Sequence, residues 1–268
     1  MKTRLKRVLV KAHWILVTQI GIDPIRMFTF VIRFPMFLVE YWQFRREFSG
    51  NVRLVPSLHD RTQEGGSTKG EYFLQDLFVA RKIFLANPEK HLDVGSRVDG
   101  FVAHVASFRE LEVVDVRPIS SEIPGIKFVQ ADLSNADSMS AFHAGDGYCD
   151  SLSCLHALEH FGLGRYGDAL DVSGFRKALQ NLAKLLKPAG VLYLSTPLGK
   201  ERVEFNANWV FHPNTIIEEA QLSGLSLASC SVLNPGAESI VTLSDEDSIK
   251  ALGEQEYCLA IFELRKSQ

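Results

Sequence analysis

The chain has 268 residues, of which 46% are apolar and 23% are charged, so it holds ample material for a hydrophobic core. Its net charge of −3 hides an asymmetry: residues 1–46 contain nine Lys and Arg against two Asp and Glu, which leaves 20 against 30 for the remainder. The acidic remainder gives no sign of nucleic-acid binding, whereas the basic head favours an acidic surface or an anionic membrane as its partner.

Residues 1–50 are expected to form a basic, amphipathic helical arm. Residues 1–20 carry apolar side chains close to helical spacing, with Lys and Arg between them. Asp23 and Pro24 then predict the N-cap and first position of a second helix, which is rich in aromatic residues. Charged residues and a proline interrupt its most apolar stretch, 27–42, which is too short to span a membrane.

Two interpretations of this arm stay open. Its apolar side chains could pack on the rest of the chain or on a second subunit, which would make a homo-oligomer. Alternatively, residues 1–48 could lie at the inner face of a membrane, with Lys and Arg near the headgroups. The basic start lacks the apolar run and cleavage site of a signal peptide, so we expect a cytoplasmic protein, peripheral to the membrane if the second interpretation holds.

Residues 51–90 are expected to hold a linker or lid and a leading helix. The glycine-rich stretch 64–70 is flexible in composition, and it would serve either as a linker or as the hinge of a lid. A helix is predicted over residues 71–86. The four cysteines form no C-x-x-C pair and are predicted to be buried free thiols, as in a reducing compartment.

Residues 91–268 alternate between strand and helix patterns, which predicts a mainly parallel sheet with helices on both faces. We expect helices at 101–108, 174–187 and 213–223, and a polar excursion at 234–255. The seven expected strands lie at 92–94, 111–116, 127–130, 149–154, 191–195, 226–233 and 256–265.

The first of these strands ends in a glycine turn. Leu92–Val94 is followed by Gly95 and, after Gly100, by a helical pattern, which is how an open α/β sheet holds a cofactor. The dinucleotide pattern G-x-G-x-x-G would need glycine at position 97, which is Arg97. An ordinary strand-to-helix turn is therefore the alternative.

Several motifs of residues 91–268 resemble those of class I S-adenosylmethionine-dependent methyltransferases. The acidic Asp115 lies 20 residues after Gly95, about the interval expected for a residue that binds ribose hydroxyls. The most specific match is the run 185–190, Leu-Leu-Lys-Pro-Ala-Gly, before a strand. The other matching segments are Leu92-Asp93-Val94-Gly95, Ala131-Asp132-Leu133 and Leu158-Glu159-His160.

This resemblance implies a Rossmann-like α/β sheet of seven strands with the last strand antiparallel, and S-adenosyl-L-methionine as the cofactor. In such a site Asp115 would bind the ribose and Asp132 the adenine amine. Arg97 departs from the usual glycine, and it would either pair with the methionine carboxylate or block the site. The implied cofactor-binding residues are Asp93, Gly95, Ser96, Arg97, Gly100, Asp115, Asp132, Leu133 and Ser153.

The whole chain also resembles a narrower, uncharacterised group of bacterial methyltransferase-like proteins, often associated with surface-polysaccharide biosynthesis. The shared segments include Asp93-Val94-Gly95-Ser96-Arg97-Val98-Asp99-Gly100-Phe101 and the run 153–168. This resemblance implies that Arg97 is a feature of the group. We therefore expect methyl transfer to a hydroxyl, on a sugar of a glycan or glycolipid precursor, with the arm near lipid-linked substrate.

The segment 153–168 leaves the fourth strand at the carboxyl edge of the sheet, where ligands bind. If residues 156–160 are helical, His156 and His160 share a face, and either could act as the general base with Glu159 orienting a ring. A structural role for either histidine is the alternative. The expected substrate contacts are Arg165, Tyr166, Asp168, Glu204, Asn206 and His212.

Other functions compete with methyl transfer. Residues 156–160 also spell H-x-x-E-H, an inverted zinc-peptidase motif, but they follow a sheet strand in a methyltransferase-like context. A divalent metal on His156, His160 and Asp168 is a minor alternative, and we expect no metal. A non-catalytic scaffold of the same fold is a further alternative, motivated by Arg97, and a nicotinamide-dependent oxidoreductase is less favoured.

Overall fold

The computed structural model describes residues 9–10, 12–61, 63, 65–66, 68, 70–142 and 147–267. The chain divides into two compact units, Met1–Ser67 and Thr68–Gln268. We call them the arm unit and the core unit, and each is described by itself. The division falls inside the segment expected to be a linker, and the leading helix belongs to the core unit.

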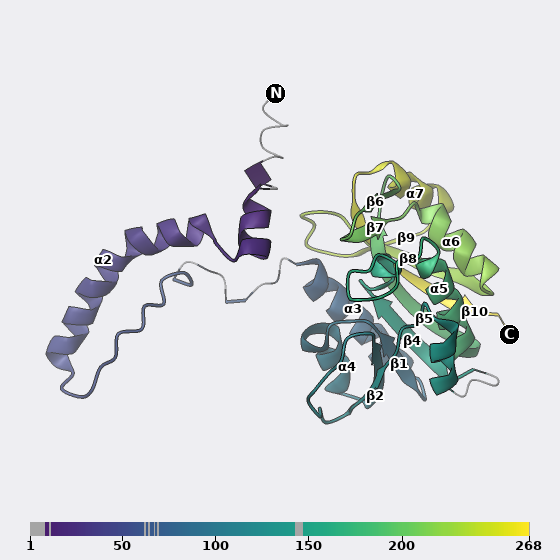
Figure 1. Cartoon of the computed structure of the whole chain (residues 1–268), viewed down its shortest axis with the longest axis horizontal. Coiled ribbons are helices and arrows are strands. Elements are labelled where there is room, and N and C mark those ends of the chain that lie inside the picture. The colour runs from purple at the N-terminus through teal and green to yellow at the C-terminus, as the bar shows by residue number, and fades with distance from the viewer. Residues whose placement is uncertain are drawn as a thin grey trace. The chain divides into compact units, whose positions relative to one another are not determined.

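The arm unit is built on one long helix (Figure 1). A helical turn, η1 (Leu16–Ile20), ends at Gly21 in the left-handed conformation, and helix α2 (Pro24–Glu47) follows. The side chain of Asp23 accepts hydrogen bonds from the backbone N–H groups of Ile25 and Arg26, which confirms the predicted N-cap. No single described helix is long and apolar enough to cross a membrane; the bent pair Ala12–Ile20 and Pro24–Glu47 passes only by its combined length and composition.

The core unit is organised around an eight-stranded sheet in the order β3-β2-β1-β4-β5-β10-β8-β9. Strands β1 to β5 run parallel, and β10 pairs antiparallel with both β5 and β8. The strands are β1 (His91–Val94), β2 (Leu111–Asp115), β3 (Ile126–Gln130), β4 (Cys149–Leu155), β5 (Leu186–Leu198), β8 (Leu225–Leu233), β9 (Val241–Leu243) and β10 (Cys258–Lys266). Strands β6 (Arg202–Glu204) and β7 (Asn208–Val210) form a separate hairpin.

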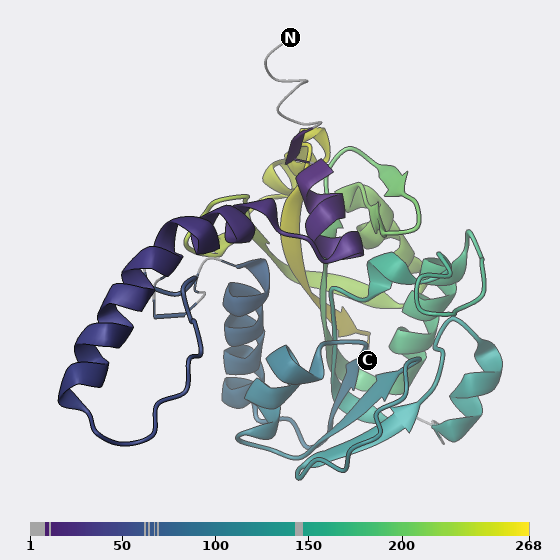
Figure 2. The ribbon, with the colours of Figure 1, turned by 60° about the vertical axis from the view of Figure 1, so that its left-hand side comes forward.

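Helices cover both faces of this sheet (Figures 1 and 2). Side chains of α3, η2 and α4 pack with Val113, Tyr193 and Ile261 in one apolar cluster. The other cluster joins α5 and α6 to Leu92, Leu152 and Phe262. The helical elements of the core are α3 (Glu71–Ala86), η2 (Val98–Val102), α4 (Ala103–Ala106), η3 (Ala136–Ala141), η4 (Leu158–His160), α5 (Gly174–Leu185), α6 (Pro213–Leu222), α7 (Glu246–Ala251) and η5 (Leu252–Glu254).

The fold confirms the predicted class and the antiparallel last strand, with corrections to the number of strands and to the end of one helix. The sheet has eight strands rather than seven, because the polar excursion 234–255 contains the short edge strand β9 and helix α7. The helix expected over 174–187 ends at Leu185, where β5 begins. Residues 156–160 do not form a helix: His156 has φ +51°, and only the turn η4 follows it. As predicted, all four cysteines are buried and free: Cys149, Cys154, Cys230 and Cys258.

Candidate functional site

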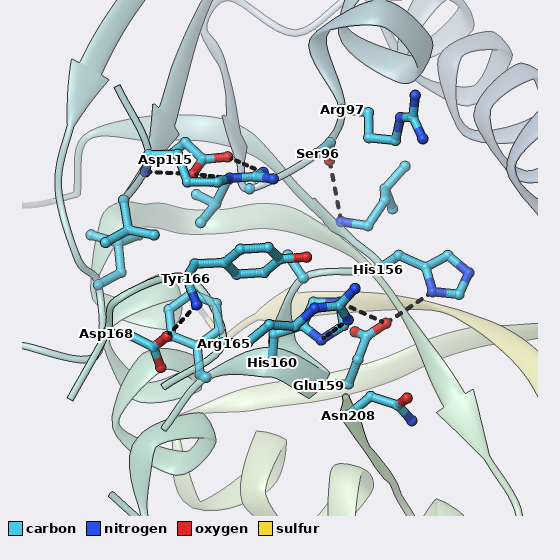
Figure 3. Close-up of a pocket in the computed structure, with 18 of the residues that line it drawn as sticks. Ser96, Arg97, Asp115, His156, Glu159, His160, Arg165, Tyr166, Asp168 and Asn208 are labelled. Carbon is cyan, nitrogen blue, oxygen red and sulfur yellow. Dashed lines mark hydrogen bonds and ion pairs between the residues drawn. The ribbon is translucent and has the colours of Figure 1, made fainter. Parts of the chain in front are cut away.

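A cavity of about 890 Å³ lies in the core unit at the carboxyl ends of the parallel strands (Figure 3). The segments that follow β1, β2, β3 and β4 all contribute to its wall, as expected for a ligand site in an open α/β sheet. The start of α3 and the residue before β10 also contribute to the wall, with Glu71, Tyr72 and Tyr257. The volume falls within the usual range for small-molecule sites.

The turn after β1 depends on Gly95. Its φ is +74°, and a Cβ atom built there would lie 2.7 Å from the Cβ of Ala157. The backbone N–H of Gly95 donates to the carbonyl of Val114, 2.8 Å away, which ties the turn to β2. The tight turn, rather than a full dinucleotide pattern, explains the glycine, since only glycine adopts this conformation so close to a neighbouring residue.

A chain of buried polar groups supports this turn from below. Asp93 accepts hydrogen bonds from the hydroxyl and the backbone N–H of Ser96, and from the hydroxyl of Ser153 at 2.6 Å. The ring of His91 joins Ser153 Oγ (Nε2, 3.1 Å) to Ser151 Oγ (Nδ1, 2.8 Å). Asp93 and Ser153 therefore lie beneath the cavity and do not line it, whereas Ser96 does.

Two further residues of the expected cofactor loop lie at its outer side. The guanidinium of Arg97 pairs with Asp99, with Nη2 2.7 Å from Oδ2, and the Arg97 side chain is 62% exposed. Arg97 thus contributes to the cavity wall from its mouth without filling the cavity. Gly100 is not in the wall; a Cβ there would lie 2.9 Å from Oδ2 of Asp76, a carboxylate of α3.

At the end of β2, Asp115 is held by an arginine that sequence reasoning did not identify. Arg117 donates to both carboxylate oxygens of Asp115, from Nε at 3.0 Å and from Nη2 at 2.6 Å. This hydrogen bond to Asp115 is the main reason that the pKa of Arg117 is raised. The same guanidinium lies over the ring of Tyr166, 4.5 Å from its centroid. The spacing Asp-x-Arg was the local signal for this pair.

Asp132 and Leu133 follow β3 in the cavity wall. The carboxylate oxygen Oδ1 of Asp132 accepts hydrogen bonds from the backbone N–H (2.8 Å) and the hydroxyl (2.7 Å) of Ser134. These two hydrogen bonds fix the carboxylate of Asp132 in the cavity wall. The side chain of Leu133 is buried and closes the wall beside it.

Opposite these residues, two histidines flank a buried glutamate. Glu159 is 1% exposed; its Oε1 lies 2.9 Å from Nδ1 of His156 and 4.0 Å from Nε2 of His160. His156 Nε2 and Glu159 Oε2 are buried, and neither has a hydrogen-bond partner among the described residues. The ring of Tyr72 lies against His156, with centroids 4.7 Å apart. The three residues are brought together by the η4 turn rather than by a shared helical face.

The two rings differ in their electrostatic surroundings. Burial alone would lower the pKa of His156, but the hydrogen bond and the charge of Glu159 outweigh it, so the pKa is raised above its usual value. For His160, burial dominates and the nearby Arg165 adds to it, so the pKa is lowered. His160 Nδ1 donates to the carbonyl of Ala207 at 2.8 Å.

The glycine-rich loop after η4 carries the next candidates. Asp168 ties the loop together, because its carboxylate accepts from the backbone N–H groups of Gly162, Gly164 and Tyr166. Tyr166 places its ring edge-on to His160, with centroids 5.5 Å apart. Arg165 donates to the carbonyl of Ala207 at 2.9 Å. All three loop residues, Arg165, Tyr166 and Asp168, line the cavity.

Of the three expected substrate contacts that follow β5, one lines the cavity and two do not. Glu204 lines the cavity and accepts from Arg202 Nε at 2.9 Å, and Asn208 lies beside it in the wall. Asn206 and His212 are not in the wall. His212 instead caps helix α6, where its Nδ1 accepts from the backbone N–H of Asn214. Among the described residues, no group of three or more His, Cys, Asp or Glu side chains is arranged to hold a metal ion.

Sequence reasoning missed the residues that reach the cavity from distant parts of the chain. Tyr72 and Glu71 begin α3, and Tyr257 precedes β10 and donates its hydroxyl to Glu71. Burial and the carboxylate of Glu71 raise the pKa of Tyr257. No local motif marks these side chains, since their position depends on where α3 and β10 pack on the sheet.

A family model matches part of the core unit. Residues 113–218 match a family described as Caenorhabditis protein of unknown function, DUF268. No curated protein matches the chain.

Several solved structures are similar to it. The cyclase SpnF is 11% identical, with a TM-score of 0.52 over 76% of this chain and 85% of its own. The N-methyltransferase NodS from Bradyrhizobium japonicum WM9, in complex with S-adenosyl-L-homocysteine, is 14% identical and covers 85% of this chain and 98% of its own, with a TM-score of 0.49. A Burkholderia thailandensis 1,6-didemethyltoxoflavin-N1-methyltransferase is also 14% identical, covering 73% and 80%, with a TM-score of 0.47. The core unit has a mixed α/β fold with a largely parallel central sheet, similar to that of SpnF.

Proposed function

We propose that this protein is an S-adenosylmethionine-dependent methyltransferase that acts on a hydroxyl group. The observation that carries the proposal is one cavity that joins the Gly95 turn and Asp115 to the buried pair His156 and Glu159. The acceptor that we would test first is a sugar of a glycan or glycolipid precursor; the wider class is a small molecule with a free hydroxyl.

The donor set of the cavity fits S-adenosylmethionine. Asp115 and Asp132 are carboxylates at the ends of β2 and β3, where they would accept hydrogen bonds from ribose hydroxyls and from the adenine amine. The Gly95 turn, fixed by Asp93 through Ser96, would lie along the methionine part of the cofactor. When bound, S-adenosylmethionine supplies a methyl group on a positively charged sulfur.

His156 suits the role of general base better than His160. A hydrogen bond from Nδ1–H of His156 to Glu159 leaves the lone pair on Nε2, for which the described part of the chain offers no hydrogen-bond partner. As the acceptor oxygen takes the methyl group, Nε2 takes the hydroxyl proton, and the carboxylate of Glu159 stabilises the resulting imidazolium. In His160 one ring nitrogen is already used by Ala207, and burial and Arg165 disfavour the charged form.

The remaining wall would bind the acceptor. Tyr166 offers a flat ring on which a sugar can lie, and Arg165, Glu204 and Asn208 offer polar groups around it. Much of the rate would come from holding the acceptor oxygen in line with the methyl group, since positioning alone lowers such barriers by several kcal/mol.

Calorimetric titration of S-adenosylmethionine and S-adenosylhomocysteine tests the cofactor site, with Asp115→Ala as the diagnostic variant. We expect the wild type to bind both, and the variant to bind more weakly by about 1–3 kcal/mol, the scale of lost hydrogen bonds to a charged group. His156→Gln is the matched control: it should bind the cofactor like the wild type and lose methyl transfer to hydroxyl acceptors. A folded wild type that binds neither molecule would refute the proposal.

The clamp on Asp115 favours a second candidate, a non-catalytic protein that keeps this fold as a scaffold. Arg117 occupies both oxygens of the carboxylate that ribose hydroxyls would need. In that case the wild type binds no cofactor, and Arg117→Ala, which frees Asp115, would create binding. Equal or weaker cofactor binding by Arg117→Ala than by the wild type would count against the scaffold.

A further inference from the structure

Helix α2 of the arm unit has a polar stripe and an opposite apolar strip. Charged residues recur every seven positions, which keeps them along one side of an α-helix. The polar stripe consists of Arg26, Arg33, Glu40 and Glu47. About half a turn away lies the apolar strip, which consists of Phe28, Val31, Pro35, Val39 and Trp42.

The polar stripe already has contacts within the arm unit. After Phe48 the chain turns and runs back beside α2 (Figure 2). Nη1 of Arg33 donates to the carbonyl of Leu58 at 2.7 Å, and Arg61 pairs with Glu40 at 2.7 Å. Both contacts lie on the polar stripe, so the returning segment 51–61 leaves the apolar strip on the opposite side uncovered by the described residues of the arm unit.

The apolar strip is broadly exposed. Phe28 is 67% exposed, Val31 69% and Trp42 61%, and α2 contains no buried residue at all. On the flank between the strip and the polar stripe, Phe30, Phe34 and Phe37 stack on one another. A contiguous apolar surface of this kind marks a contact with a partner or a membrane.

Charge favours a lipid surface over a protein partner. The strip itself carries no acid, and Arg45 and Arg46 stand at its C-terminal end in the last turn of α2. The sequence before it, residues 1–11, adds five further Lys and Arg and no Asp or Glu. An apolar strip with cations at both ends matches a bilayer that has apolar chains and anionic headgroups.

The geometry favours a helix that lies in the plane of the bilayer rather than one that crosses it. Arg33 and Glu40 lie in the middle of α2, so a crossing helix would bury both charges in hydrocarbon. The left-handed Gly21 and the Asp23 cap bend the chain by 81° between Ala12–Ile20 and α2. The preceding segment is apolar as well, with Trp14, Ile15 and Ile20 exposed.

We propose that α2 and the turns before it form an in-plane anchor that binds anionic lipid bilayers through the apolar strip. The polar stripe and the returning segment 51–61 then face the water. This inference is independent of the proposed methyl transfer, because the anchor residues all belong to the arm unit and the cavity residues to the core unit.

Flotation of the full-length chain with vesicles tests the anchor, using phosphatidylcholine with or without phosphatidylglycerol. The double variant Val31→Glu/Trp42→Glu places two acids on the strip. Thr29→Glu/Gln43→Glu adds the same charge outside the apolar strip and is the matched control. We expect binding to vesicles containing phosphatidylglycerol that falls at least about tenfold in the strip variant and stays near the wild-type value in the control.

Arg45→Gln and Arg46→Gln separate the charge contribution from the apolar one. Each should weaken binding to anionic vesicles about fivefold and leave binding to neutral vesicles unchanged. Three results would overturn the anchor: equal loss in the strip variant and its control, no vesicle binding by a folded wild type, or a dimer in sedimentation that the strip variant dissolves while vesicle binding is absent.

Discussion

The polar chain beneath the cavity makes a specific prediction about stability and pH. Ser153 gives its proton to Asp93, so it must accept from Nε2–H of His91, and Ser151 must donate to Nδ1. This arrangement needs a neutral imidazole. Burial lowers the pKa of His91 from 6.5 to about 3 and raises that of Asp93 from 3.8 to about 6, the latter against the hydrogen bonds that Ser153 and Ser96 donate.

These two shifts have opposite consequences. For Asp93 the folded state holds a proton that the unfolded chain has lost, so stability falls as pH rises from 3.8 to about 6. For His91 the unfolded chain binds the extra proton, so stability rises as pH rises from about 3 to 6.5. Each effect approaches about 1.4 kcal/mol per pH unit, and over their common range they nearly cancel.

Single substitutions should expose each slope. Urea denaturation gives the free energy of unfolding of each variant relative to the wild type at about pH 4.3 and about pH 5.8. Between these pH values, that relative free energy should rise by about 1.5 kcal/mol for Asp93→Asn and fall by about 2 kcal/mol for His91→Gln, whatever its value at the lower pH. Because each variant is compared at two pH values, the pH-independent cost of its lost hydrogen bonds cancels. A stability difference from the wild type that stays constant with pH in both variants would refute the burial argument.

Two further predictions concern the cavity itself. The variants Gly95→Ala and Gly224→Ala place alanine at nearly the same positive φ, +74° and +78°, but only at Gly95 does the new Cβ meet another atom, the Cβ of Ala157. In urea denaturation Gly95→Ala should therefore lose about 1–3 kcal/mol more of the free energy of unfolding than Gly224→Ala. Equal losses in the two variants would argue against a tight turn. Glu159→Gln removes the main cause that raises the pKa of His156. The rising limb of the plot of kcat/KM against pH should therefore move to lower pH. If the position of that limb does not change, His156 is not the base that titrates.

The sequence was informative wherever local chemistry decides the structure. Asp23 and Pro24 correctly predicted the start of α2, because an N-cap side chain and the fixed φ of proline determine the backbone within the first turn of a helix. The helix expected at 71–86 has these bounds in the structure, since its apolar spacing is regular and a left-handed Asn87 ends it. The alternation of strands and helices was likewise enough to predict the fold class, whereas the antiparallel last strand was expected only from the resemblance to class I methyltransferases.

Where long-range packing decides, the sequence was insufficient. The sequence leaves open whether residues 156–160 are helical, and they are not: the backbone N–H of His156 bonds to Ser195 on the neighbouring strand, which holds His156 in a left-handed turn. Both histidines lie close to Glu159, as expected, but the η4 turn rather than a shared helical face brings them together. Arg117 and Tyr257 line the cavity although neither was predicted to do so. Arg117 lies there because it pairs with Asp115, and Tyr257 because of the position of β10.

The position of β10 between β5 and β8 also has a consequence for how the chain is made. A ribosome releases β5 and β8 before β10, so for a time both strands carry open edges on a sheet that lacks its central partner. Fully buried side chains of β10, such as Phe262 and Leu264, are then still missing from the apolar core. The nascent core is thus most exposed to misassociation just before β10 emerges, and chaperone dependence during translation should fall once that strand is free to insert.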